Sequence, residues 1–241
     1  MITIESAENS LKKLFGPDGV KDKVFLDVGS GSGLFSLAAR RMGASVISFD
    51  YDLNSVACTQ ALKNKFFPDD PDWNIFQASV LDQSALDGFN PDIIYSWGVL
   101  HHTGDMKLAI DNIITFGKRS KSKVMISIYN DQLWLSKYWT YVKRAYNINL
   151  VLRCLIIIMH FPFLFIARYL VRLISGRLEE ERGMKIWYDM IDWLGGYPFE
   201  YAKPEFIFEK FQQNGYVLTF IKTCGGRMGC NEFIFEVDQG Q

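Results

Sequence analysis

The sequence predicts an α/β fold with a mostly parallel sheet that ends in an antiparallel hairpin. Short β-branched and apolar runs alternate with helix-like stretches, as in a sheet whose two faces are both covered by helices. The last two runs are joined only by a glycine-rich linker, 223–231, which is too short for a helical crossover. With 241 residues, of which 49% are hydrophobic and 22% charged, the chain suits one large domain or one domain that carries an insertion.

Seven runs are expected to form the strands, and their bounds are Val24–Val28, Ser45–Phe49, Asn74–Gln77, Asp92–Ser96, Lys123–Ile128, Val217–Lys222 and Glu232–Glu236. Stretches long enough for crossover helices separate the first five runs, among them Leu34–Met42, Asn54–Lys65 and Met106–Lys118. The first five strands are therefore expected to pair in parallel.

One segment differs from the rest of the chain in charge. Residues 132–178 contain seven basic residues and no acidic residue, so the remainder is acidic. We expect a single domain over residues 1–241, with a mainly helical insertion at about 130–202.

The overall composition excludes several classes of protein. A net charge of -1 disfavours a basic nucleic-acid-binding protein, so nucleic acid is not an expected partner. The four cysteines have neither CxxC nor zinc-finger spacing, which indicates free thiols and no metal site. The amino-terminal residues contain no secretory signal pattern, so a cytoplasmic location is expected.

The strongest local signal is a buried strand followed by the turn Gly29-Ser-Gly31-Ser-Gly33 and a helix. A dinucleotide-binding loop has its third glycine three residues after the second, so this spacing disfavours pyrophosphate and a nicotinamide-dependent oxidoreductase. Asp27, just before the turn, suits a ligand with a positive amino group. Asp50 follows the second strand, where a carboxylate can accept hydrogen bonds from both ribose hydroxyls of a nucleoside.

These residues resemble a class I S-adenosylmethionine-dependent methyltransferase, which implies S-adenosylmethionine as the cofactor. The motifs that carry the resemblance are Asp27-Val-Gly29-Ser-Gly31-Ser-Gly33, Asp50, 77–82 and 92–102. The resemblance implies a Rossmann-like seven-stranded sheet in the order 3-2-1-4-5-7-6, with strand 7 antiparallel. The insertion between strands 5 and 6 departs from the minimal fold, and such additions carry acceptor selection in this family.

The same resemblance assigns cofactor contacts to individual residues. Asp27, Gly29, Gly31 and Gly33 correspond to the methionine end and Asp50 to the ribose. Ser79 and Val80 correspond to the adenine and Trp97 to the methionine-side loop. Tyr51 is expected to pack on the ribose or adenine, and the alternative is a half-buried surface aromatic.

His101 and His102 follow the fourth strand and are the candidate catalytic residues. A histidine with a pKa near neutrality can remove the proton of an acceptor hydroxyl, and no metal is required. A structural role in the loop is the alternative. The loop Ser96-Trp97-Gly98-Val99 lacks the Asn/Asp-Pro-Pro-aromatic pattern of enzymes that methylate exocyclic or amide nitrogens, so DNA-adenine and glutamine chemistry are disfavoured.

The expected activity is methyl transfer by in-line displacement to a small or lipid-like acceptor, above all at oxygen, as in quinone-type methyltransferases. An N- or S-methyltransferase of a small metabolite and a non-catalytic cofactor-binding protein are the alternatives. The residues expected near the acceptor are aromatic, acidic or basic, and they are Tyr129, Tyr188, Asp192, Tyr197 and Arg227. Aromatic packing and capped turns are the structural alternative for this group.

The insertion contains the apolar run Cys154–Ala167, which is too short for a membrane span of about 20 residues. Pro162 is expected to divide it into two helices. The first expectation for this segment is a lid that closes the acceptor pocket or a homodimer interface. A peripheral membrane contact through residues 132–178 is the alternative, since basic and aromatic residues lie around the apolar run. RNA is disfavoured by the long uncharged run.

Overall fold

The computed structural model describes residues 3–167, 169–170, 186–226 and 229–238. The chain forms two compact units. The sheet unit comprises Ile4–Asp131 and Tyr201–Gln241, and the helical unit comprises Gln132–Glu200. Each unit is described by itself below.

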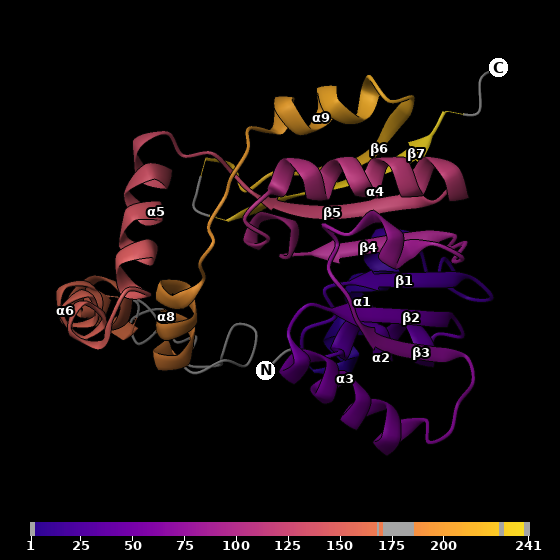
Figure 1. Cartoon of the computed structure of the whole chain (residues 1–241), viewed down its shortest axis with the longest axis horizontal. Coiled ribbons are helices and arrows are strands. Elements are labelled where there is room, and N and C mark those ends of the chain that lie inside the picture. Colours follow the sequence, from indigo (N-terminus) through magenta and orange to yellow (C-terminus); the bar gives the residue numbers. More distant parts are fainter. Residues whose placement is uncertain (1–2, 168, 171–185, 227–228, 239–241) are drawn as a thin grey trace. The chain divides into compact units, whose positions relative to one another are not determined.

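The sheet unit contains a seven-stranded sheet in the order β3-β2-β1-β4-β5-β7-β6 (Figure 1). β1 to β5 pair in parallel, whereas β7 pairs antiparallel with both β5 and β6. The strands are β1 Val24–Val28, β2 Ser45–Asp50, β3 Trp73–Gln77, β4 Ile93–Trp97, β5 Lys123–Tyr129, β6 Tyr216–Lys222 and β7 Cys230–Val237. The predicted fold class and strand order are confirmed.

The helices of the sheet unit begin at local sequence signals. The Asp52 carboxylate accepts a hydrogen bond from Asn54 N–H at 3.2 Å, and the Asp105 carboxylate accepts one from Leu108 N–H at 3.1 Å, so both are N-caps. The α-helices are α1 Ile4–Phe15, α2 Leu34–Arg41, α3 Leu53–Phe66, α4 Met106–Ser120 and α9 Pro204–Gln212. Two 3-10 turns, η1 Gln83–Leu86 and η2 Leu100–His102, follow β3 and β4.

Alternating residues of the central strand serve the two faces of the sheet. Leu26 and Val28 belong to the apolar core that also contains residues of α4 and α9. Asp27 lies between them in sequence, so its side chain points to the opposite face, where its carboxylate meets Ser36 of α2. This alternation brings an acidic side chain under the glycine turn without breaking the core.

The helical unit consists of α5 Trp134–Tyr146, α6 Leu150–Phe161, the π-helical segment η3 Pro162–Ala167 and α8 Ile186–Gly195. Figure 1 views α6 almost along its axis, beside α5 and α8. α5 contacts both α6 and α8, and α8 also contacts η3. The buried side chains of this unit include Trp139, Ile156, His160, Leu164, Met190 and Leu194.

The expected division at Pro162 is confirmed, because α6 ends at Phe161 with Pro162 as its C-cap and the π-helical η3 begins at Pro162. Pro162 has helical backbone angles, φ -58° and ψ -41°, and the chain continues from α6 into η3. Proline has no N–H to donate to the preceding turn, and a wider π turn accommodates that loss. Leu150–Ala167 is thus one 18-residue helical stretch with a mean hydropathy of 2.4, long and apolar enough to cross a membrane by length and composition. The expectation that this run is too short for a span is wrong, because the helical stretch begins at Leu150 and not at Cys154.

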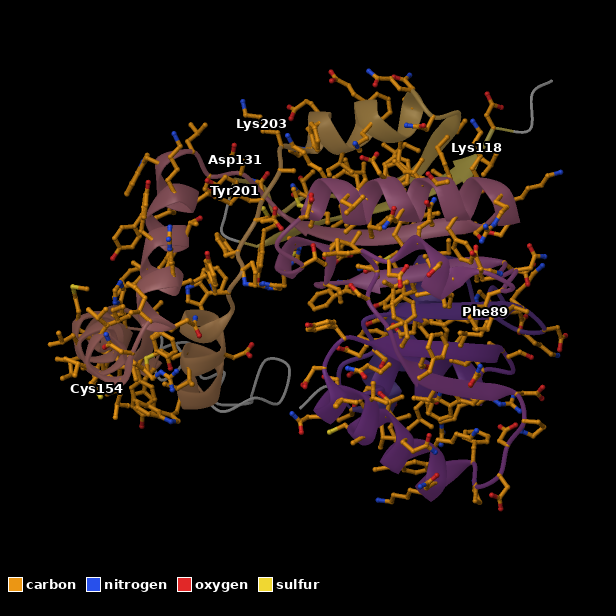
Figure 2. The ribbon with its side chains drawn as sticks, viewed as in Figure 1. Phe89, Lys118, Asp131, Cys154, Tyr201 and Lys203 are labelled. Carbon is orange, nitrogen blue, oxygen red and sulfur yellow. The ribbon has the colours of Figure 1, made fainter. Side chains whose placement is uncertain are left out.

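The two chain segments that lead into and out of the helical unit are paired. Asn130 and Ala202 form a parallel bridge, and Ala202 N–H donates to the Tyr129 carbonyl at 3.0 Å. Asp131 N–H in turn donates to the Ala202 carbonyl at 3.1 Å. Asp131 and Tyr201 are labelled side by side in Figure 2. Both connecting segments are therefore held by hydrogen bonds at the end of β5.

Candidate functional site

The carboxyl ends of the parallel strands carry most of the predicted site residues. The glycine turn follows β1, Asp50 is the last residue of β2, and Trp97 is the last residue of β4. Open α/β sheets bind their ligands along this edge, beside the point where the strand order reverses. Here the order reverses at β1, which has β2 on one side and β4 on the other.

The glycines of the turn after β1 have two different roles. All three have positive φ: 77° at Gly29, 54° at Gly31 and 76° at Gly33. A Cβ on Gly29 would lie 2.4 Å from a Val99 methyl, and one on Gly33 would lie 2.8 Å from the Thr59 Cα. A Cβ on Gly31 would meet nothing within 4 Å. Gly29 and Gly33 therefore allow close packing, whereas Gly31 borders open space that a ligand can fill.

Asp50 holds the turn in place. Its carboxylate accepts hydrogen bonds from Gly31 N–H at 2.9 Å and from Asp52 N–H at 3.0 Å, one at each oxygen. A carboxylate has about four acceptor positions, so two remain for a ligand. Tyr51, the next residue, is 77% exposed, and its carbonyl accepts a hydrogen bond from the Gln77 side chain at 3.0 Å.

Asp27 ends a buried chain of hydrogen bonds. The Trp73 indole donates to Ser48 at 2.9 Å, Ser48 donates to Ser36 at 2.8 Å, and Ser36 donates to the Asp27 carboxylate. Burial raises the pKa of the Asp27 carboxyl to about 7; the hydrogen bond from Ser36 opposes the rise, and the charge of Asp50 adds to it. A cationic ligand group beside Asp27 would favour its ionised form.

The segment after β3 is anchored from α4. The Asn112 side chain donates hydrogen bonds to the Val80 carbonyl at 2.9 Å and the Leu81 carbonyl at 3.1 Å. Ser79 Oγ accepts from Leu81 N–H at 3.2 Å, which closes a local turn. The Val80 side chain is buried in the core.

His101, His102 and Tyr129 form an aromatic cluster where β4 and β5 end. The ring centroids of His101 and Tyr129 are 4.1 Å apart, and those of the two histidines are 4.6 Å apart. His101 is fully buried, and its Nδ1 accepts a hydrogen bond from Tyr129 N–H at 3.3 Å. That bond requires the neutral tautomer with its hydrogen on Nε2. His102 is half-buried.

The other predicted acceptor residues lie in different parts of the chain. Asp192 is exposed on α8, and Tyr197 follows α8 with 44% of its surface exposed. Tyr188 lies in α8, but its side chain is outside the described residues, as is the whole of Arg227. Tyr129 is the one acceptor candidate in the sheet unit whose surroundings are described. These acceptor assignments stay predictions.

Three polar residues that support the site were not singled out from the sequence: Ser36, Thr59 and Asn112. Thr59 Oγ1 lies 3.0 Å from Ser30 Oγ, and its Cα blocks any side chain at Gly33. Each of the three is a small polar residue with a buried side chain inside a helix. A polar residue on the apolar face of a predicted amphipathic helix is the signal that marks such buried hydrogen bonds.

The residues along this edge fit S-adenosylmethionine by their chemistry. Asp50 has acceptor positions for ribose hydroxyls, and Asp27 provides a carboxylate for an ammonium group. The space beside Gly31 allows the ligand to approach the backbone.

The chain also matches known proteins. The model of a family described as methyltransferase domain matches residues 5–190. A search of the curated proteins finds no match.

Solved structures share the fold at low sequence identity. Magnesium protoporphyrin IX methyltransferase from Synechocystis PCC 6803, solved with bound S-adenosylhomocysteine, has a TM-score of 0.60 and 13% identity, and the match covers 98% of this chain and 83% of that chain. An O-methyltransferase family protein from Burkholderia thailandensis has a TM-score of 0.57 and 11% identity, over 99% of this chain and 59% of that chain. At such identities the likeness shows the fold alone. Together with the family match, it shows that this chain belongs to the class I S-adenosylmethionine-dependent methyltransferases.

Proposed function

We propose that this enzyme transfers the methyl group of S-adenosylmethionine to an oxygen atom of a small or lipid-like acceptor. The observation that carries the proposal is the aromatic cluster of His101, His102 and Tyr129 at the edge of the sheet beside the glycine turn. A hydroxyl acceptor has to lose a proton during transfer, and an imidazole with a pKa near neutrality is suited to accept it.

His102 is the proposed base, and His101 is its support. Nδ1 of His101 already accepts the Tyr129 N–H, and Nε2 then carries the hydrogen, so neither nitrogen of the neutral ring is available for a proton. His102 is half-buried and packs edge-on against both His101 and Tyr129. A ring in that position can be reached by an acceptor while its orientation is restrained.

The cofactor contacts are proposed for the residues along the same edge. Asp50 accepts hydrogen bonds from the ribose, Asp27 faces the amino group, and Gly29, Gly31 and Gly33 shape the methionine end. Tyr51 covers the nucleoside, Ser79 and Val80 border the adenine, and Trp97 borders the methionine-side loop. S-adenosylmethionine supplies a methyl group already activated on a sulfonium, so the protein chiefly aligns the acceptor and removes its proton.

A lipid-like acceptor is supported by the helical unit, where α6 and η3 expose large apolar side chains. The proposal does not depend on metal chemistry.

The test is a methyl-transfer assay with labelled S-adenosylmethionine and matched probes. A phenol or quinol, an amine and a thiol with the same apolar skeleton would be compared, and we expect label in the hydroxyl compound. Label only in the amine or only in the thiol would show that the acceptor atom is nitrogen or sulfur and not oxygen. No transfer to any probe, with intact cofactor binding, would favour the non-catalytic reading.

The role of His102 is tested under conditions in which chemistry limits the rate. His102→Ala is expected to reduce kcat by about 10²- to 10⁴-fold and to remove the acidic limb of the pH profile. His102→Ala with full turnover would exclude His102 as the base.

A further inference from the structure

The α6–η3 stretch has the reverse of the pattern expected for a helix on the surface of a soluble protein. Its outer side carries large apolar residues that are 42 to 70% exposed, and we call them the outer stripe: Leu150, Val151, Leu155, Ile158, Met159, Phe163 and Ile166. Its inner side carries a polar residue, the buried His160, whose Nε2 lies 2.7 Å from the Tyr138 hydroxyl.

The spacing confirms that the two sides are distinct helical faces. Ile156, His160 and Leu164 are buried and recur every four residues, whereas Leu155, Met159 and Phe163 recur in the same way on the exposed side. Only 17% of Leu150–Ala167 is buried. A contiguous group of exposed apolar side chains on a protein surface indicates a site that binds another molecule.

Basic and aromatic residues accompany the stripe. Lys137, Arg144 and Arg153 are exposed, and residues 132–178 contain no acidic residue. Trp134 and Tyr141 of α5 are 73% and 71% exposed. Tryptophan and tyrosine favour the headgroup level of a bilayer, and lysine and arginine favour anionic lipid.

We propose that the outer stripe inserts into the interface of an anionic lipid bilayer, with Lys137, Arg144 and Arg153 at the headgroups. The helix lies in the plane of the membrane and does not cross it. The inner side of the helix is tied to α5 through Tyr138 and His160, so crossing would carry polar groups of the helical unit into the hydrocarbon.

Charge argues against a second copy of this chain as the occupant. A two-fold dimer brings the same patch of both copies together. The basic residues beside the stripe would then face one another with no acidic residue from this segment to pair with them. An anionic lipid surface provides the opposite charge.

The experiment measures binding of the purified full chain to vesicles by flotation. Phosphatidylcholine vesicles and vesicles with about a third phosphatidylglycerol would be compared at low and high salt. We expect binding to the anionic vesicles, weakened by salt, and a blue shift of tryptophan fluorescence as Trp134 enters the interface. This readout is independent of methyl transfer, so it does not depend on the proposed acceptor.

Matched variants locate the contact. Ile158→Glu and Phe163→Glu are expected to reduce vesicle affinity at least tenfold. Val217→Glu, at an apolar residue of β6 that is 49% exposed, is expected to leave it unchanged. Lys137→Gln with Arg144→Gln should weaken binding about fivefold for each charge removed, whereas Lys12→Gln with Lys13→Gln on α1 should not.

Two outcomes would overturn the proposal. One is that the unmodified chain does not bind anionic vesicles at low salt. If the chain is then a dimer, and Ile158→Glu dissociates it, the outer stripe joins two copies of the chain. The other is equal loss of binding with Val217→Glu and Ile158→Glu. Quenching of tryptophan fluorescence by brominated lipid is measured in the unmodified chain and in Trp134→Phe, which guards against variants that misfold. Quenching that Trp134→Phe reduces supports the contact, and no quenching in the unmodified chain contradicts it.

Discussion

The Asp50 carboxylate accepts the Gly31 N–H at 2.9 Å, so the end of β2 is bonded to the one glycine of the turn that borders open space. A single side chain therefore both shapes the glycine turn and retains acceptor positions for a ligand. Loop geometry and ligand binding are coupled at Asp50.

Asp50→Ala is expected to weaken S-adenosylmethionine binding by at least 100-fold. The change removes hydrogen bonds from a charged acceptor, each worth about 1.5–3 kcal/mol, and frees the Gly31 amide. Isothermal titration calorimetry measures the affinity, with Asp87→Ala, an exposed carboxylate paired with Arg119, as the control. Unchanged affinity in Asp50→Ala would contradict the proposed ribose contact.

Alanine at the three glycines is expected to separate packing from binding. Gly29→Ala places a methyl 2.4 Å from Val99 and should lower the free energy of unfolding by several kcal/mol. In Gly31→Ala the added methyl meets no atom, so the free energy of unfolding should fall only by the cost of a left-handed alanine, about 1–2 kcal/mol. Cofactor affinity should fall, because the methyl occupies space proposed for the ligand. Chemical denaturation and calorimetry on both variants check this. A Gly31→Ala variant with normal affinity would show that the ligand lies elsewhere.

Cofactor affinity is expected to depend on pH through Asp27. Its pKa is about 7 in the free protein, and a cationic amino group nearby favours the ionised form. Affinity should therefore fall toward tenfold per unit as the pH drops below 7, with proton release on binding near neutrality. Calorimetry in buffers of different ionisation enthalpy detects the released proton. Asp27→Asn should show neither effect.

The same residue affects stability in a defined direction. Because the folded pKa of Asp27 exceeds the ordinary value of 3.8, the folded protein holds more protons than the unfolded chain between about pH 4 and 7. The contribution of Asp27 to stability thus declines as the pH rises through this window, by a total of about 4 kcal/mol without ligand. Urea denaturation of Asp27→Asn should lack this decline, and an identical pH dependence in both proteins would refute it.

Lys143 gives the helical unit the opposite dependence. Its ammonium lies 4.0 Å from the Trp193 ring centre and 4.8 Å from the Phe199 ring centre, and it donates to the Trp193 carbonyl. Burial lowers the pKa of Lys143 to about 7, and the charge of Asp192 partly opposes the shift.

Below pH 7 both states of the chain carry the Lys143 charge, and between about 7 and 10.5 only the unfolded state does. The contribution of Lys143 to stability should therefore rise with pH across that window. Thermal unfolding of the helical unit, followed by tryptophan fluorescence from pH 6 to 10, measures this. Lys143→Met should flatten the rise, and a rise that persists in this variant would assign it to another group.

The positions of Asp27, Asp50 and the glycines could be predicted, because a strand–turn–helix motif is contiguous in sequence, and the strand order followed from the resemblance to class I methyltransferases. The bond from Ser36 to Asp27 could not, since it depends on how α2 packs on β1. The end of α6 at Pro162 could be predicted from the N–H that proline lacks, but the sequence did not show that the chain continues there as a π-helix.

The tautomer of His101 was also beyond the sequence. The tautomer is set by the backbone N–H of Tyr129 in β5, 28 residues away. The sequence alone shows two adjacent histidines and gives no reason to prefer either as the base. Parallel pairing of β4 and β5 creates the difference between them.

The bridge between Asn130 and Ala202 has a consequence for how such a chain can change. Because the two ends of the segment between them meet on the sheet unit, the whole helical unit could be shortened, lengthened or exchanged while the register of all seven strands is kept. A short glycine linker in place of 132–200 would test whether the sheet unit folds alone. Chains with the same sheet unit can thus come to accept different methyl acceptors when the helical unit is exchanged, because Asn130 and Ala202, where it is attached, are already paired.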